Sequence, residues 1–389
     1  MDVNSSFKKN NLTFTIKGGD GHGWALDQTL EYVKDTLEAY TSWENVKSIK
    51  FADIVIFPWY PGFKEFEYLI SKQQIVVCFL DNDSEKVYPF LSKKKYIENI
   101  DIWLTHSSKE KEKLRRYGYE AYILPSSPKN KIKANTNIDK YFSNKLLDSL
   151  KKFQKFSNKK LILSIQRDSS FINGSWVPKD QKNPQYLLNL YKKSFENKLP
   201  YILVLAGTRR HWIVKKLDEQ KLPYLFLGEK PIYKDDYWNN KIPREIISQL
   251  IKECDYSIIT SSWEGGPLCI RESLDENVPV FSTPVGNSSD LLSEQLILSG
   301  VLNNDINLIN GIITSNAKTS FLLNESIKKY SKFVDQDINN IIFSIIEINK
   351  LKQIKSNFIR NLIVFDTFFE KVELFLSKII RRLKIYLSR

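Results

Sequence analysis

Two glutamates, Glu264 and Glu272, stand in a segment where a predicted strand turns into a predicted helix, with seven residues between them. Gly265 and Gly266 follow the first glutamate, and glycines let backbone N–H groups approach a ligand closely. The N-terminus of the helix that begins at Leu268 favours a bound phosphate. Each carboxylate can accept two hydrogen bonds from vicinal hydroxyls of a sugar or a ribose. The segment therefore predicts a cradle for a phosphorylated ligand, with two acceptors for its hydroxyl groups.

Several cations lie upstream of these glutamates. Arg167 follows one predicted strand, and Lys182 precedes a predicted helix. Cations fixed at a strand end would stabilise the negative charge that develops on a leaving diphosphate. Arg209 and Arg210, which come soon after Gly207 at the end of the next strand, are further candidates for this role.

Short apolar runs alternate with amphipathic segments along most of the chain, which is typical of parallel sheets covered by helices on both faces. In the first half we predict strands at Leu12–Ile16, Asp53–Phe57, Ile75–Leu80, Ile102–Thr105 and Tyr122–Leu124, and helices at Trp24–Leu37 and Ser108–Tyr117. In the second half we predict strands at Leu161–Ile165, Tyr201–Ala206, Tyr224–Leu227, Tyr256–Thr260 and Val278–Ser282, and helices at Pro184–Phe195, His211–Gln220, Pro243–Lys252 and Leu268–Glu276. Open sheets of this kind bind ligands at the carboxyl ends of their strands, where the glutamates and cations lie.

The alternation is interrupted once, and the interruption sets the expected domain boundaries. Residues 136–160 are rich in Lys, Asn and Ser, which is typical of a linker. We expect one Rossmann-like domain over residues 1–135 and a second over 161–350. Residues 351–389 have the spacing of one long amphipathic helix with a basic tip. This helix fits two arrangements, completing the first domain with residues 355–389 or resting on an anionic membrane.

Composition and residue spacing argue against several classes of protein. The 58 Lys and Arg outnumber the 45 Asp and Glu, which gives a net charge of +13, but no basic run interleaved with aromatics indicates nucleic-acid binding. The three cysteines and three histidines lack metal-ligand spacing. The N-terminus is polar, and no apolar run reaches the roughly 20 residues that span a bilayer. A cytoplasmic protein is expected, with peripheral membrane contact as the alternative.

The segment Ser262–Leu292 resembles the signature of the family 4 glycosyltransferases, which have two Rossmann-like domains in the GT-B fold. It contains Glu-Gly-Gly-Pro-Leu-Cys-Ile-Arg-Glu at 264–272, Val-Pro-Val at 278–280 and Asp-Leu-Leu at 290–292. Asn277 stands where the family usually has glycine, and Asp290 where it has glutamate. Upstream, Arg167 and Lys182 resemble the family's Gly-Arg…Lys-Asn pair, although Gln166 replaces the glycine and the intervening loop is longer.

The resemblance implies a retaining transfer from a nucleotide sugar to a glycan or lipid-linked acceptor, in the synthesis of cell-surface polysaccharide or lipopolysaccharide. Glu264 would bind the donor sugar, Glu272 the ribose, and Arg167 with Lys182 the diphosphate. No metal or other cofactor is implied, because the leaving diphosphate itself helps to deprotonate the acceptor. The other residues implied in donor binding are Gly265, Gly266, Pro267, Leu268, Gly207 and Arg209.

The acceptor is expected at the first domain, where Gly19, Gly21 and His22 form a glycine-rich loop after a strand. The family often has a histidine after the strand that matches Ile75–Leu80, and here the sequence is Asp-Asn-Asp at 81–83 instead. His106 follows the next strand and is the substitute that the sequence offers. The Asp-Asn-Asp tripeptide also fits the metal motif of the other large glycosyltransferase class, GT-A.

Other functions stay open at this stage. One is an inactive protein of the same fold that binds a nucleotide sugar or a partner, and another is a nucleotide-sugar epimerase or a phosphorylase. A nucleic-acid-binding protein is a third alternative, and only the net charge of +13 suggests it.

Overall fold

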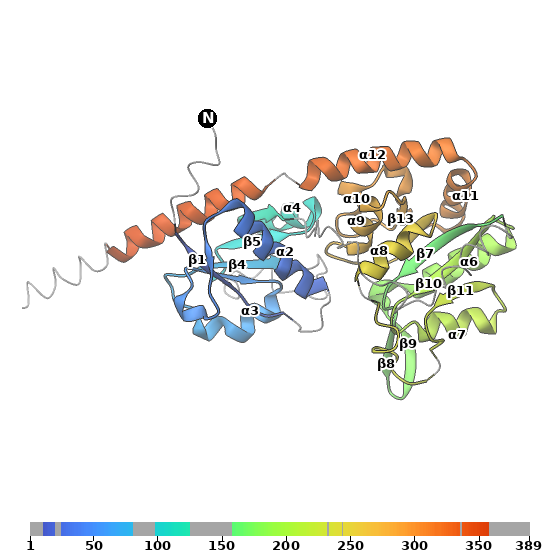
Figure 1. The fold of residues 1–389 in the computed structure, drawn as a ribbon, viewed down its shortest axis with the longest axis horizontal. Coiled ribbons are helices and arrows are strands. Elements are labelled where there is room, and N and C mark those ends of the chain that lie inside the picture. Colours follow the sequence, from blue (N-terminus) through green and yellow to red (C-terminus); the bar gives the residue numbers. More distant parts are fainter. Residues whose placement is uncertain are drawn as a thin grey trace, which may run out of the picture.

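The computed structural model describes residues 11–19, 25–80, 98–124, 158–231, 233–242, 244–334 and 337–357. Two parallel β-sheets, one in each half of the chain, form the frame of the molecule (Figure 1). Each sheet has a buried apolar cluster on both of its faces. Two Rossmann-like domains are therefore present, as the alternating pattern predicts.

The N-terminal sheet has six strands, all paired in parallel. Its middle strands are buried on both faces, which explains why they are continuous apolar runs in the sequence. In spatial order the strands are β2 (Glu44–Asn45), β1 (Thr13–Ile16), β3 (Ile54–Phe57), β4 (Ile75–Leu80), β5 (Ile102–Thr105) and β6 (Ala121–Ile123). The helices between them are α2 (Ala25–Tyr40), α3 (Tyr60–Phe66) and α4 (Ser108–Arg116).

The C-terminal sheet has five parallel strands, and their order changes direction at β7. The order is β11 (Tyr224–Leu227), β10 (Tyr201–Ala206), β7 (Lys160–Ile165), β12 (Tyr256–Ile259) and β13 (Val280–Ser282). The helices are α6 (Pro184–Glu196), α7 (His211–Glu219), α8 (Arg244–Lys252), α9 (Leu268–Asp275), α10 (Ser288–Leu291), α11 (Leu302–Ile313) and α12 (Asn316–Val334). The chain goes outward from β7 to β11, then returns to β12 on the other side. Such a switch point opens a crevice between the loops after β7 and β12.

An antiparallel hairpin interrupts the second domain between β7 and α6. It consists of β8 (Ser169–Ile172) and β9 (Ser175–Pro178). The turn residues Asn173 and Gly174 both have positive φ, 50° and 79°, as a two-residue type I′ turn requires. The hairpin is not among the strands predicted from the sequence, although Asn-Gly between alternating apolar residues is a strong hairpin signal.

A long helix at residues 338–357 lies on the N-terminal sheet, after α12 has crossed the second domain (Figure 1). Ile341 and Ile345 pack into the same cluster as Val33 of α2. Lys352 donates to the carbonyl of Gln74 (2.6 Å). The expected long C-terminal helix is thus present, but its described part begins earlier than residue 351. Residues 358–389 and the basic tip lie outside the described residues.

The two domains are also tied by polar contacts. Asp337, just before the helix of residues 338–357, accepts from the backbone N–H of Ile123 (2.9 Å) and pairs with Lys111 of α4. The carboxylate of Asp290 on α10 accepts from the backbone N–H of Ser108, the first residue of α4 (2.8 Å). A carboxylate there is favoured by the helix dipole. The bond to Asp290 holds the N-terminal end of α4 against the second domain, and Asp337 fixes the start of the helix of residues 338–357 to the first domain.

None of the described helices is long and apolar enough to cross a membrane. The described residues also contain no cluster of His, Cys, Asp and Glu that could hold a metal ion. Asp81, Asn82 and Asp83, which fit the GT-A metal motif in sequence, lie outside the described residues.

The packing of the helix at residues 338–357 can be tested with two substitutions on its opposite faces. Ile345 is 1% exposed and Phe343 is 56% exposed. Ile345→Ala should lower the free energy of unfolding by about 2–4 kcal/mol, because it leaves a cavity in the core. Phe343→Ala should change it by less than about 1 kcal/mol. Urea unfolding of the full chain measures both, and equal effects would contradict this packing.

Candidate functional site

The loops after β7 and β12 meet at the switch point of the second sheet. The backbone N–H of Ser262 donates to the carbonyl of Gln181 (2.8 Å). The carbonyl of Lys182 accepts from Thr260 Oγ1 (3.4 Å) and from Gln166 Nε2 (3.5 Å). The short 3₁₀ helix Asp180–Lys182 is therefore fixed between both strand ends. This arrangement brings the two sequence-predicted motifs together, although they are about 80 residues apart in the chain.

An ion pair between Lys182 and Glu264 lies at the centre of this region. Glu264 also accepts a hydrogen bond from Ser261 Oγ (2.7 Å). The two charged side chains are 21% and 12% exposed, so the pair is only partly screened by solvent. Asn183, with φ of +46°, directly follows Lys182 and caps α6 by accepting from the N–H of Tyr186.

Further cations surround this ion pair. The pKa of Lys179 is lowered to about 8, first by burial and then by the positive charges of Arg167 and Lys182, against the opposing effect of Glu264. Mutual repulsion of this kind shows that the cations are close together. Three cations around one carboxylate leave a net positive charge that suits a phosphate or a diphosphate. Lys179 is not among the residues predicted from the sequence, although it stands three residues before Lys182 in the same loop.

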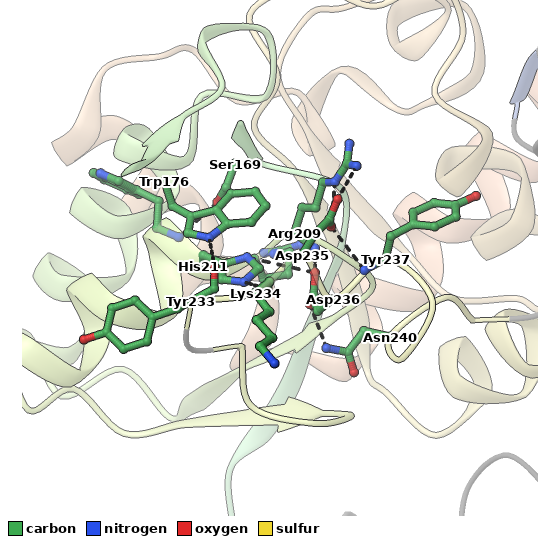
Figure 2. A network of polar contacts seen from close by, with 12 residues as sticks. Ser169, Trp176, Arg209, His211, Tyr233, Lys234, Asp235, Asp236, Tyr237 and Asn240 are labelled. Atoms are coloured by element: carbon green, nitrogen blue, oxygen red, sulfur yellow. Dashed lines mark hydrogen bonds and ion pairs between the residues drawn. The ribbon is translucent and has the colours of Figure 1, made fainter. Parts of the chain in front are cut away.

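Arg209 belongs to the outer edge of the cluster. It follows Gly207, whose φ of +94° lets the chain turn sharply after β10. Its guanidinium binds both carboxylate oxygens of Asp235, at 3.0 and 2.6 Å. It also lowers the pKa of Lys179, so it contributes to the positive field of the site. Figure 2 shows Arg209 with Asp235 in the polar network that holds the segment of residues 233–240.

A buried ion pair holds the strand ends in place behind the site. Asp168 and Arg210 are fully buried, and Arg210 Nε lies 2.9 Å from Asp168 Oδ2. Arg210 also donates to the carbonyls of Ser164 (3.0 Å) and Gln166 (2.9 Å). The pKa of Asp168 is raised to about 6, because the effect of burial exceeds the opposing effect of the Arg210 charge. Arg210 therefore connects the ends of β7 and β10, and it is not available to a ligand.

The turn after Glu264 is tightly packed. A Cβ on Gly266 would lie 2.7 Å from Cβ of His106 in the first domain. Gly286, with φ of +52°, approaches the same turn from the other side, and a Cβ there would lie 2.3 Å from the carbonyl oxygen of Gly265. Pro267 then caps α9, which begins at Leu268. Close packing thus requires glycine at both positions, against the side chain of His106 at Gly266 and against the backbone of Gly265 at Gly286.

Glu272 is the fifth residue of α9 and is partly exposed. Its neighbour Arg271 is buried, and burial lowers the pKa of that guanidinium to about 10. Cys269 is a free thiol whose pKa burial raises to about 12, so it stays protonated near neutral pH. Among residues 268–272 of α9, Glu272 is therefore the charged side chain that is exposed enough to contact a polar ligand.

His106 lies at the contact between the domains. It follows β5, stacks on Phe79 with the ring centroids 5.3 Å apart, and touches Gly266. The pKa of His106 is lowered to about 3, first by burial and then by the positive charge of Arg271. The imidazole is neutral at physiological pH, because its pKa lies far below that range.

The strand ends of the first sheet carry a second close approach. Gly18 has φ of +86°, and a Cβ there would lie 2.9 Å from the Cα of Gly62. The carbonyl of Gly18 accepts a hydrogen bond from Trp59 Nε1 (2.9 Å). Gly19 follows directly, and a Cβ there would lie 2.5 Å from the carboxylate of Asp27. These residues follow β1 and β3, where the strand order of this sheet changes direction. Gly21 and His22 lie outside the described residues.

The family profile of Glycosyl transferases group 1 matches residues 148–305. The match contains the loops after β7 and β12 with Arg167, Lys182, Glu264 and Glu272. A search of the curated protein sequences found no similar one.

Solved structures of similar fold include three glycosyl-transferring enzymes. TarM of S. aureus, solved as a point mutant in complex with fondaparinux, alpha-GlcNAc-glycerol and UDP, is 13% identical with a TM-score of 0.52, and the alignment covers 76% of this chain and 55% of TarM. The pneumococcal O-GlcNAc transferase GtfA, in complex with UDP and GlcNAc, is 10% identical with a TM-score of 0.51. The alignment covers 76% of this chain and 56% of GtfA. The trehalose 6-phosphate synthase of Burkholderia multivorans is 12% identical with a TM-score of 0.56. The alignment covers 78% of this chain and 72% of the synthase.

At these identities the likeness shows the fold, and the GT-B fold expected from the sequence is confirmed. The chain spans little more than half the length of TarM and GtfA. The family match and the fold together support a glycosyltransferase. Membership of family 4 and the roles of the individual site residues stay predictions.

The low pKa of Lys179 predicts how a diphosphate ligand responds to pH. The amine is protonated below pH 8 and loses its charge as the pH rises through about 8, so nucleoside diphosphate binding should weaken between pH 7 and 9. Lys179→Arg should bind with much less pH dependence, because a guanidinium stays charged. Calorimetry with UDP, GDP, CDP and ADP at both pH values measures this. Equal pH dependence of binding in the wild type and in Lys179→Arg would show that Lys179 does not take part in nucleoside diphosphate binding.

Proposed function

We propose that the protein transfers a hexosyl group from a nucleotide-sugar donor to a glycan or lipid-linked acceptor, with retention of anomeric configuration and without a metal ion. The observation that carries this proposal is the Lys182–Glu264 ion pair at the switch point of the second sheet, with Arg167 and Lys179 beside it. The arrangement supplies positive charge for a diphosphate and a carboxylate for a sugar at one place.

The cations would bind the diphosphate and stabilise it as a leaving group. In the transition state the bond from the sugar to the diphosphate breaks, and negative charge grows on the diphosphate oxygen. Lys182 can donate hydrogen bonds to this oxygen and to Glu264 at the same time, because an ammonium group has three N–H donors. Arg167, whose planar guanidinium suits two phosphate oxygens, would hold the other phosphate.

The carboxylates would position the two sugar units of the donor. Glu264 is held by Ser261 and Lys182, so it can present its remaining lone pairs to hydroxyls of the transferred sugar. Glu272, one turn into α9, would accept from the ribose hydroxyls. Gly265, Gly266, Pro267 and Leu268 would place backbone groups against the donor, with Gly207 and Arg209 at its far end.

Retention follows in this proposal from a front-face transfer. The acceptor hydroxyl attacks from the side that the diphosphate leaves, and a diphosphate oxygen takes the hydroxyl proton. The strand ends of the first domain, with Gly19 and the predicted loop of Gly21 and His22, are proposed to bind the acceptor. The proposed setting is synthesis of cell-surface polysaccharide or lipopolysaccharide at the cytoplasmic face of a membrane, with the C-terminal segment as a peripheral contact.

Turnover of nucleotide sugars tests the proposal without knowledge of the acceptor. The assay measures release of nucleoside diphosphate from UDP-, GDP-, CDP- and ADP-sugars, with water as the slow acceptor. Glu264→Gln and Lys182→Ala should each lower kcat about 100-fold, because each removes a charge that acts on the transition state. Glu272→Ala should mainly raise the donor KM, about tenfold.

Exposed residues of the same types provide controls. Glu196→Gln and Lys193→Ala change an exposed pair at the C-terminal end of α6 and should leave turnover unchanged. An α-configured released sugar from an α-linked donor, seen by NMR before mutarotation, would support retention.

Donor binding without any turnover would favour an inactive scaffold, and interconversion of the donor sugar would favour an epimerase. Equal turnover in Glu264→Gln and the wild type would refute the assignment of this site.

A further inference from the structure

A cavity of about 510 Å³ lies between the β8–β9 hairpin, α7 and the segment after β11. Phe171 and Trp176 of the hairpin line one side, Trp212 of α7 another, and Tyr233 the third. The volume lies in the range of small-ligand sites. Neither the donor site nor the acceptor site proposed above uses these aromatic residues.

The aromatic wall of this cavity is rigid. The ring of Trp176 stacks on that of His211, with centroids 3.8 Å apart and an interplanar angle of 5°. Trp176 Nε1 donates to the carbonyl of Tyr233 (2.8 Å), and His211 Nε2 contacts the carbonyl of Lys234 (2.8 Å). Figure 2 shows the two stacked rings and the segment that both side chains hold. The platform is therefore formed before any ligand arrives.

Large apolar rings remain exposed around this platform. Tyr233 is 83% exposed and Phe171 is 59% exposed, and Phe171 lies 5.2 Å from Trp176 between ring centroids. Several exposed aromatic side chains grouped at a concave site indicate a ligand or a partner, whereas single ones need no explanation. Flat rings of this kind suit a ligand with a flat apolar face and a polar edge.

The charges at the rim identify the chemistry of that ligand. Two lysines, Lys215 and Lys230, line the cavity together with two acids, Asp218 and Glu219. The four lining charges sum to zero: Lys230 pairs with Asp218 (2.7 Å), and Glu219 lies between Lys215 (3.9 Å) and Lys216 of α7 (2.7 Å), which is outside the lining. The rim is thus neutral in a protein with a net charge of +13. A nucleic acid or an anionic membrane would be expected to select a positive surface.

We propose that this cavity binds a neutral oligosaccharide. The C–H face of a pyranose ring would stack on Trp176 and Tyr233, and the hydroxyls at its edge would bond to the charged side chains of the rim, which offer both donors and acceptors. The site is separate from the donor site. That the glycan is the acceptor or product of the enzyme itself rests on the proposed function.

The hairpin connects this cavity to the donor site. Its strands join Arg167 to Lys179, and the N–H of Lys179 donates to the carbonyl of Asp168 (2.7 Å). The N–H of Ser169 donates to the carbonyl of Arg209 (3.0 Å). The same insertion that lengthens the loop between the two diphosphate-binding cations thus builds the aromatic platform. A glycan held there would stay close to the transfer site between successive reactions.

Saturation-transfer NMR on the full chain tests this proposal. The probes are three neutral oligosaccharides, maltotetraose, cellotetraose and tetra-N-acetylchitotetraose, and an anionic heparin tetrasaccharide. At least one neutral probe should bind, with the strongest transfer to ring C–H protons, and UDP should not displace it. Tyr233→Ala should weaken that binding about tenfold, since it removes one stacking ring.

Tyr68→Ala is the matched control, because Tyr68 is 81% exposed in the first domain and lies away from the cavity. It should leave oligosaccharide binding unchanged. Lack of binding by all three neutral probes, stronger binding of the heparin fragment, or equal binding by Tyr233→Ala and Tyr68→Ala would overturn the proposal. Nucleotide-sugar turnover by Tyr233→Ala, measured in parallel, shows whether the transfer site is intact, so failure here can be told apart from failure of the proposed function.

Discussion

The contact between the loops after β7 and β12 is the constraint on which the rest of the site depends. Parallel strands end at one edge of their sheet, and the reversal of strand order at β7 leaves room there for a ligand. Lys182 and Glu264 come from the two sides of that switch point and form one ion pair. The buried Asp168–Arg210 pair holds the neighbouring strand ends and leaves the outer cations to the ligand.

The same loop also forms part of the contact between the domains. Gly266 touches His106, and Asp290 accepts from the N–H of Ser108, both in the first domain. A neutral imidazole fits this contact better than a charged one, because Arg271 is close by. The helix of residues 338–357 then returns to the first sheet. The turn that follows Glu264 is therefore packed between residues of both domains.

Local patterns in the sequence predict most of this architecture. β4 and β10 match their predicted bounds, Ile75–Leu80 and Tyr201–Ala206, because each is a continuous apolar run that ends at a polar or turn residue. Motif spacing identifies Lys182 and Glu264. The contact of His106 with Gly266 is not visible in the sequence, since it joins residues 160 positions apart. The hairpin has a local signal, Asn173-Gly174, but Lys179 has none, because its approach to Lys182 and Glu264 depends on how the long loop folds.

A thermal-shift screen of the purified protein tests the donor site most directly. The ligands are UDP-, GDP-, CDP- and ADP-sugars, with and without EDTA, and the comparison is Glu272→Ala. A ligand that binds only the folded state raises Tm. One nucleotide class should raise Tm, EDTA should leave that shift intact, and Glu272→Ala should make the shift clearly smaller at the same ligand concentration. Absence of a shift with every nucleotide sugar, or a full shift in Glu272→Ala, would contradict the proposed donor site.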